Sequence, residues 1–269
     1  MRASLAVAAG LALAGLAFQL PAAADTREPR LDPRQVIERS QAAIGRPLGN
    51  HQLVDSTGAP LRLDAYRGKP LVISLVYTAC SSVCPVTTQH LIDAVGEARR
   101  MLGKDQFAVL TVGFDARNDT PARLAHFASA QGVRLDNWRL ASGDTGTVAG
   151  LLRDLGFSYA RIAGGFDHIT QTTIVDREGR IYRHVYGEDF PVQMFMEPLK
   201  DVVYGTTTTF TFSGLVDRVK YICTIYDPGA GRYRIDYGLV FGSVIAAFSL
   251  VVMGGLILRE WRRAGRRAA

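Results

Sequence analysis

Away from its two ends, the 269-residue chain carries almost no net charge. The formal net charge is +6, but five arginines and one glutamate from Arg259 to Arg267 supply +4, and Arg2 supplies +1, which leaves +1 for all other residues. A chain without a basic region lacks the electrostatic attraction on which nucleic-acid binding depends, so we expect no nucleic-acid partner. The sequence also shows no convincing internal repeat, so the fold must be inferred from its successive local patterns.

Cysteine is scarce, since Cys80, Cys84 and Cys223 are the only three. A structural disulfide between Cys80 and Cys84 would close a very short ring, and disulfide stabilisation grows with loop length, so a redox or metal-binding role is favoured. If these two act together, Cys223 is left over. It is then a small buried hydrophobe, an intermolecular disulfide partner or an extra metal ligand.

Two long apolar runs lie near the ends of the sequence. Residues 1–24 combine Arg2, an apolar stretch and three alanines, which is typical of a secretory signal peptide; an uncleaved anchor is the alternative. Residues Gly238 to Leu258 contain no charge and match the roughly 20 residues that a helix needs to cross a bilayer. The arginines that follow are typical of a cytoplasmic tail. We therefore expect a C-terminal transmembrane helix, with the main domain outside the membrane and the tail inside.

These patterns divide the chain into six segments with different expected roles. They are a signal peptide at 1–24, a lead-in at 25–46, an α/β domain at 47–204, a spacer and membrane-proximal hairpin at 205–237, a transmembrane helix at 238–258, and a basic cytoplasmic tail at 259–269.

The central segment alternates strand and helix patterns from residue 70 onward, in the order β-α-β-α-β-α-β-β-α. A short helix over 33–43 and a hairpin over 51–63 precede it. A parallel strand, a cysteine pair, a helix and a later antiparallel hairpin together predict an α/β, thioredoxin-like fold. The expected strands are 70–78, 107–114, 138–141, 170–176 and 181–187, and the expected helices begin near Ser82, Pro121, Asp144 and Phe190.

The cysteine pair lies between the strand at 70–78 and the helix that follows it. Ser82 is a candidate cap for this helix, so Cys84 lies near a helix N-terminus, where at least one thiol becomes more acidic. Ligands in open α/β sheets bind beyond the carboxyl ends of strands, which is where the cysteines fall. Two sulfurs at i and i+4 can share an ion, and thiolates select copper(I) or zinc.

An imidazole is the natural third ligand, and the sequence offers five histidines. His51, His90, His126 and His184 fall in or beside regular elements, where a surface or core role is expected. His168 differs because it stands in a glycine-rich loop just before a strand, and functional residues concentrate on such loops. The sequence also offers Asp115, either as an orienting carboxylate or as an ordinary turn residue.

Three motifs in this order and spacing resemble the Sco/SenC family of copper-binding assembly proteins. They are YTACSSVCP at 77–85, GFDARNDTP at 113–121 and DHITQTTIVDREGRI at 167–181. The resemblance covers roughly residues 47–204. It implies that Cys80, Cys84 and His168 bind copper. It also implies a membrane-tethered periplasmic domain that helps to assemble the binuclear copper site of cytochrome c oxidase subunit II, with an upstream protein as copper donor.

The chain departs from that family in two places. Many members carry an acidic residue between the cysteines, where this chain has Ser81, Ser82 and Val83. Many members also have an N-terminal anchor, whereas this chain has a predicted cleavable signal and a predicted C-terminal transmembrane helix.

Copper delivery by ligand exchange is therefore one interpretation, and an enzyme, a thiol-disulfide reductase using Cys80 and Cys84, is another. A peroxidase of the peroxiredoxin type is disfavoured, because that family has threonine where this chain has Tyr77.

Overall fold

The computed structural model describes residues 31–204, 224–227, 232–235 and 237–267. The predicted signal peptide, Cys223 and most of the predicted spacer lie outside the described residues.

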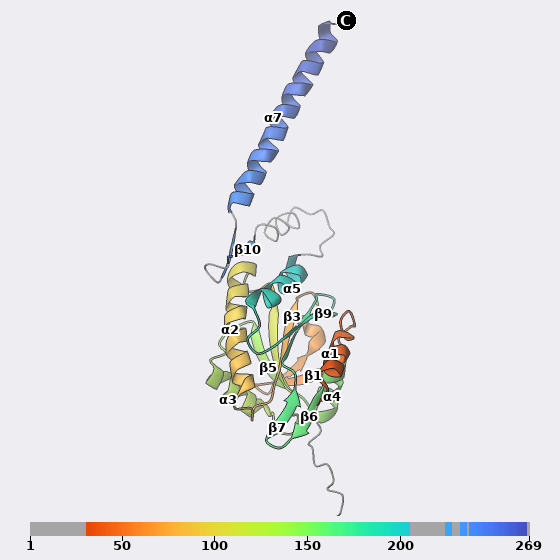
Figure 1. Cartoon of the computed structure of the whole chain (residues 1–269), viewed down its shortest axis with the longest axis vertical. Coiled ribbons are helices and arrows are strands. Elements are labelled where there is room, and N and C mark those ends of the chain that lie inside the picture. The colour runs from red at the N-terminus through yellow and green to blue at the C-terminus, as the bar shows by residue number, and fades with distance from the viewer. Residues whose placement is uncertain (1–30, 205–223, 228–231, 236, 268–269) are drawn as a thin grey trace, which may run out of the picture.

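A seven-stranded sheet forms the centre of the fold, in the order β2-β1-β5-β4-β3-β8-β9 (Figure 1). Strand β3 pairs in parallel with β4 and antiparallel with β8, while β4 pairs in parallel with β5 and β8 forms a hairpin with β9. This mixed sheet confirms the predicted α/β, thioredoxin-like arrangement. The strands are β1 (Gln52–Asp55), β2 (Pro60–Arg62), β3 (Leu71–Val76), β4 (Ala108–Gly113), β5 (Trp138–Ser142), β8 (Gln171–Val175) and β9 (Ile181–Tyr186).

Helices cover both faces of the sheet. Alternate residues of β3 point to opposite faces: Val72 and Val76 pack with helices α2, α3 and α5, whereas Leu71 and Ile73 pack with α4. Burial on both sides explains why β4 is buried along its whole length. The helices are α1 (Pro33–Gln41), the 3₁₀ helix η1 (Leu63–Tyr66), α2 (Val83–Leu102), α3 (Pro121–Gln131), α4 (Thr145–Asp154) and α5 (Val192–Tyr204).

Two of the predicted helix starts are confirmed in detail. Thr120 caps α3 with Pro121 in its first turn, and Gly132 ends this helix in the left-handed conformation. Asp144 caps α4 by accepting hydrogen bonds from the N–H groups of Gly146 and Thr147. Local side-chain chemistry therefore determines where these helices begin.

A second, smaller hairpin was not predicted. Strands β6 (Tyr159–Ile162) and β7 (Gly165–His168) pair antiparallel, in a segment for which the sequence predicted a glycine-rich loop. Gly164 and Gly165 have φ angles of 87° and 154°, which other residues rarely adopt. The glycines form a tight turn between two strands, so His168 lies at the end of a strand.

The C-terminal part contains the predicted hairpin, β10 (Thr224–Asp227) and β11 (Arg232–Ile235), and the long helix α7 (Tyr237–Arg267). Helix α7 extends away from the layered domain (Figure 1) and includes the whole of 238–258. Within the described residues, no helix reaches the combination of length and apolar content that crossing a membrane requires. The helical conformation of 238–258 is thus confirmed, and its membrane crossing stays a prediction.

Asp55 is a buried carboxylate at the end of β1. Its Oδ1 accepts hydrogen bonds from the N–H of Thr57 at 2.9 Å, the hydroxyl of Thr57 at 2.6 Å and the N–H of Ala59 at 3.0 Å, and its Oδ2 pairs with Arg139. Burial alone would raise the pKa of Asp55, but these partners outweigh burial and lower the pKa to about 2.

We expect Asp55→Asn to remove part of the acid sensitivity of the domain. Because the pKa of Asp55 is lower in the folded chain than its usual 3.8, its stabilising contribution is complete above that pH and disappears as the pH falls toward 2. The variant should be less stable than the parent at pH 7, and the difference should shrink between pH 4 and 2. Thermal melts across this range test it; a difference that stays constant with pH would contradict it.

Candidate metal and thiol site

The cysteine pair lies at the carboxyl end of β3, at the start of α2. Both thiols are free, and Cys84 is buried with 3% of its surface exposed, whereas Cys80 is only half-buried. Helix α2 begins at Val83, so Cys80 precedes it and Cys84 lies in its first turn. One sulfur is therefore reachable from solvent and the other is enclosed.

The sulfur of Cys80 caps the start of helix α2, which is the role predicted for the side chain of Ser82. The side chain of Ser82 makes no capping hydrogen bond, so that prediction was wrong. Instead the N–H of Cys84 donates to Sγ of Cys80 at 3.3 Å. The first N–H groups of a helix have no partner within the helix, and the Cys80 sulfur satisfies one of them.

The two thiols differ in acidity. Burial would raise the pKa of Cys80, but the N–H groups of Cys84 and Ser82, the Cys84 thiol and the Tyr77 hydroxyl outweigh burial and lower the pKa. Burial, together with the neighbouring Cys80 and Asp119, raises the pKa of Cys84 far above its usual range. The prediction of at least one acidic thiol is confirmed, and that thiol is Cys80.

Tyr77 connects the cysteines with the β6–β7 hairpin. Burial, followed by its hydrogen bond to Cys80, raises the pKa of Tyr77 to about 12, while a hydrogen bond from the backbone of Phe166 acts in the opposite direction. Gly165 leaves room for this hydroxyl, because a Cβ at that position would lie 2.7 Å from the Tyr77 oxygen. This role of Tyr77 was not predicted, because nothing in the local sequence pairs its hydroxyl with Cys80 or with the segment around Gly165.

Tyr77→Phe is expected to make Cys80 less acidic, because it removes only the hydroxyl that stabilises the Cys80 thiolate. One hydrogen bond is worth about 1 kcal/mol, so alkylation of Cys80 at pH 7 should slow roughly fivefold. The measurement is the pH profile of iodoacetamide labelling at Cys80, read by peptide mass spectrometry. An unchanged profile would show that the hydroxyl does not act on this sulfur.

Asp119 holds the loop that carries the cysteines. Its Oδ1 accepts hydrogen bonds from the N–H of Thr78 at 2.8 Å and the hydroxyl of Thr78 at 2.7 Å, and its Oδ2 accepts from the N–H of Asp115 at 2.9 Å. Gly113 permits this approach, since a Cβ there would lie 2.5 Å from Cβ of Asp119. No role was predicted for Asp119, although it lies within the motif GFDARNDTP.

Asp115 behaves as a turn residue that also reaches the β6–β7 hairpin. Its carboxylate accepts a hydrogen bond from Nδ2 of Asn118 at 2.7 Å and lies 3.5 Å from the Arg161 guanidinium. Arg161 in turn stacks on the ring of Phe166, with 4.6 Å between the guanidinium carbon and the ring centroid. Of the two expectations for Asp115, the structure supports the turn role.

His168 ends strand β7 and packs among aromatic rings. The centroid of its ring lies 5.3 Å from that of Phe114, 5.6 Å from that of Phe157 and 6.2 Å from that of Tyr77. Nδ1 donates to the carbonyl oxygen of Ile169 at 3.0 Å, which leaves the lone pair of Nε2 free. A backbone carbonyl on one ring nitrogen is the usual arrangement for a histidine that ligates a metal through the other.

The structure brings the two cysteines together but does not add His168 to them as a ready-made ligand. In the described part of the chain, no three side chains of histidine, cysteine, aspartate or glutamate are placed to hold a metal ion. Tyr77 contacts both the cysteine pair and the histidine, since it hydrogen-bonds Cys80 and packs edge-on against His168. The predicted metal site therefore consists of two neighbouring sulfurs, and the ring of Tyr77 separates them from the imidazole of His168.

The other four histidines have the surface or core positions that were expected. His126 is exposed on α3. His51 pairs with Asp154 at 2.6 Å, and His90 bonds the carbonyl oxygen of Phe190 at 2.7 Å. His184 is buried beside the hydroxyl of Thr173 at 2.9 Å.

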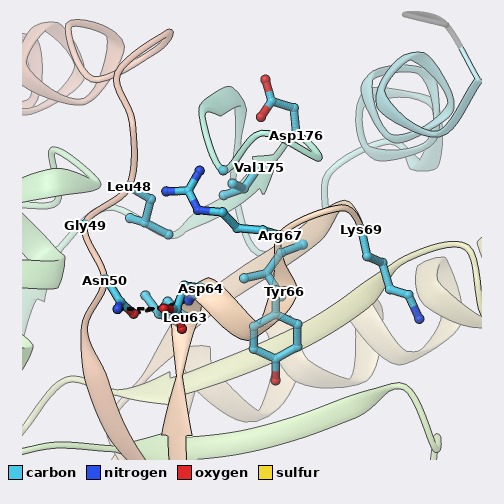
Figure 2. A pocket seen from close by; sticks show the side chains of 12 residues that line it. Leu48, Gly49, Asn50, Leu63, Asp64, Tyr66, Arg67, Lys69, Val175 and Asp176 are labelled. Atoms are coloured by element: carbon cyan, nitrogen blue, oxygen red, sulfur yellow. Dashed lines mark hydrogen bonds between the residues drawn. The ribbon is translucent and has the colours of Figure 1, made fainter.

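A separate hollow lies at the opposite end of β3 and contains none of these residues. Figure 2 shows it between the segment around Asn50 and the turn that carries Arg67, with the Asn50 amide bonded to Asp64 at 2.8 Å. Lys69 and Leu71 precede or begin β3, whereas Cys80 follows its carboxyl end. This hollow is therefore not part of the thiol site.

Comparison with known proteins gives a consistent result. A SCO2-like protein of Rickettsia conorii is 24% identical over 162 residues, which cover 57% of this chain and 75% of that protein. A SCO1 protein homolog of Bacillus subtilis is 27% identical over 88 residues, or 32% of this chain and 44% of that protein.

Solved structures share the fold. BsSco, a member of the Sco family of cytochrome c oxidase assembly proteins in which a disulfide switch was identified, matches with a TM-score of 0.54 and 18% identity, over 61% of this chain and 96% of that one. Arabidopsis thaliana ScoI with copper bound matches with a TM-score of 0.51 and 15% identity, over 61% of this chain and all of that one.

A mixed sheet with a CxxxC pair between strand β3 and helix α2 defines a thioredoxin-like domain with an accessible thiol site. The SCO1/SenC family model matches residues 39–203, well over half of the chain. The chain belongs to the SCO1/SenC family.

Proposed function

We propose that this protein binds copper as cargo and delivers it to, or prepares, the binuclear copper site of cytochrome c oxidase subunit II. The observation that carries the proposal is the pair of free sulfurs at the carboxyl end of β3, one acidic and accessible and the other buried, in a chain of the SCO1/SenC family. Among its structural relatives, ScoI of Arabidopsis was solved with copper bound, and BsSco is described as a member of a family of cytochrome c oxidase assembly proteins.

The residues present fit copper(I) in their chemistry. Thiolate sulfur is a ligand that selects copper(I), and the sulfurs of Cys80 and Cys84 already interact with each other. His168 would complete the set through Nε2, because Nδ1 is already committed to the carbonyl oxygen of Ile169. In this proposal Cys80 faces the incoming and outgoing partner, an upstream copper donor or the recipient protein, and Cys84 anchors the ion from within.

The alternative function is that of a thiol-disulfide reductase acting on the cysteines of an exported copper protein. The asymmetry of the two thiols favours it, since an accessible, acidic Cys80 suits the attacking role and a buried Cys84 suits the resolving role. The disulfide switch described for BsSco is consistent with this second function.

Anaerobic copper(I) titration of the reduced full-length chain in detergent, against a competing chelator, tests the main proposal. One copper bound per chain supports it. Absence of binding with a measurable Cys80–Cys84 reduction potential would leave the reductase as the function of the site.

We also propose that the chain is held in a bacterial inner membrane by 238–258, with the main domain in the periplasm and the arginine-rich tail in the cytoplasm. The absence of charge over this range supports the proposal. So does the exposure of large apolar side chains on α7, such as Phe248 at 69% and Val251 at 73%. Exposed apolar surface of this kind requires a cover, and lipid is a cover that fits.

Truncation after residue 237 is expected to move the protein from the membrane to the soluble fraction of the cell envelope. The reason is that residues 1–237 then keep only the predicted signal peptide, which is removed on export. Fractionation of cells expressing either form, followed by immunoblotting, measures the change. A truncated chain that stays in the membrane would show that the anchor lies elsewhere, with uncleaved residues 1–24 as the candidate.

A further inference from the structure

A hollow of about 450 Å³ lies beside Cys80, between the start of α2 and helix α3. Ala79 and Pro85 line it together with Cys80, and Phe127 and Ala130 line it from α3. Sites for small molecules have volumes of about 300–1,000 Å³ and are lined mainly by apolar groups. The accessible sulfur therefore faces a space larger than a metal ion needs.

Helix α3 presents one cationic side chain, that of Arg123, to this hollow. Arg123, His126 and Ala130 are spaced i, i+3 and i+7, so they lie on one side of the helix, and all three are exposed. No residue of α3 is acidic. In the described ranges the guanidinium of Arg123 has no carboxylate partner, and the one hydrogen bond of its side chain, to the carbonyl oxygen of Asn118, is 3.5 Å long. The guanidinium group of Arg123 at the edge of the hollow is therefore available to bind an anion.

We propose that this hollow binds a small peptide thiol, or the disulfide of such a thiol, with a carboxylate at Arg123 and the sulfur at Cys80. The inference rests on the proposed function, because it takes Cys80 as the reactive sulfur, and it adds a class of substrate to that site. The apolar lining accommodates the carbon skeleton of the peptide, while the cationic rim selects its negative charge.

The chemistry with a disulfide RS–SR is a two-electron transfer. The Cys80 thiolate attacks one sulfur of the ligand, a Cys80–SR bond forms, the S–S bond breaks, and RS⁻ leaves with the electron pair. Cys84, after losing its proton to solvent, then attacks Sγ of Cys80 and expels the second RS⁻. The protein dithiol becomes a disulfide, the ligand is reduced to two thiols, and the reverse sequence reduces the protein.

Protection of Cys80 from alkylation measures this binding without any redox step. The full-length chain in detergent, reduced and metal-free, is treated with iodoacetamide in the presence of increasing S-methylglutathione, which is anionic and cannot exchange. Labelling at Cys80 is followed by peptide mass spectrometry. We expect saturable protection that weakens about tenfold or more in Arg123→Gln, the factor expected for one charge-assisted hydrogen bond. Arg183→Gln, which removes an exposed arginine on β9 away from the hollow, is the matched control and should protect as the parent does.

A second arm compares oxidised glutathione with cystamine, a cationic disulfide. The parent should react faster with the anionic disulfide, and Arg123→Gln should lose this preference. Equal protection in Arg123→Gln and in the parent would overturn the proposal. So would an arginine-dependent preference seen only with a long acidic cysteine peptide, which would assign the hollow to a segment of a partner protein.

Copper(I) binding measured on the same preparations separates this inference from the proposed function. Loss of glutathione selectivity with copper binding intact refutes the inference alone. Selectivity that persists in a chain unable to bind copper refutes the copper function and leaves the substrate class in place.

Discussion

Replacing Cys80 or Cys84 with alanine is expected to abolish tight copper(I) binding, and replacing His168 with alanine to weaken it. A single remaining sulfur cannot chelate, so each cysteine variant should lose more than the roughly 10–100-fold in affinity that a supporting residue of a metal site typically contributes. His168 lies one aromatic ring away from the sulfurs, so its loss should cost less than that of either cysteine. Chelator competition on the full-length chain gives the three affinities.

Ser82→Ala is the matched control for these variants. Ser82 lies between the two cysteines, is exposed, and makes no side-chain capping bond, so copper affinity should equal that of the parent. If Ser82→Ala lost affinity to the same degree as the cysteine variants, the losses would report damage to the loop and the assignment of ligands would fail.

Phe114→Ala is expected to be strongly destabilising and to disturb His168. Phe114 is 2% exposed, and its ring packs against Tyr77, Phe166 and His168 with centroid distances of 5.4, 5.2 and 5.3 Å. Buried phenylalanine-to-alanine changes cost about 3–5 kcal/mol, which corresponds to a fall in Tm on the order of 10 °C. Thermal melts measure the first effect, and the imidazole NMR signals of His168 measure the second.

Phe107→Ala separates the two effects. Phe107 is fully buried, but it belongs to the cluster on the other face of the sheet and precedes β4, whereas Phe114 follows that strand. We expect a similar fall in Tm with unchanged signals from His168. If both variants shifted the His168 signals equally, the aromatic ring of Phe114 would have no particular role in placing that histidine.

The layered fold was predictable because its signals are local. The buried strands appear in the sequence as continuous apolar runs. Two helix starts are indicated by their capping residues, one by Thr120 followed by Pro121 and the other by Asp144. The hairpin over β1 and β2 was likewise visible in alternating residues around a turn. Wherever a few neighbouring residues decide the conformation, sequence reasoning was sufficient.

The environment of the cysteines was only partly predictable, because it depends on residues far apart in the chain. Asp119 reaches back 41 positions to Thr78, and the Tyr77 hydroxyl fits only because Gly165 lacks a side chain. Ser82 was a sound choice of cap by residue type, but the sulfur of Cys80 occupies the place instead. Contacts between residues so far apart in the chain cannot be predicted from local sequence spacing, because they form only when the sheet brings its strand ends together.

The hydrogen bond from the Cys84 amide to the Cys80 sulfur has a consequence for how the state of the site can be observed. A negatively charged sulfur is a better acceptor than one that has formed a disulfide or given its electron pair to a metal. The first turn of α2 therefore loses part of its cap whenever Cys80 changes its bonding. Fraying of a helix end is visible in amide hydrogen exchange. The exchange rate of a single backbone amide, that of Cys84, thus reports whether the sulfur of Cys80 is a free thiolate or is bonded to a metal or to another sulfur.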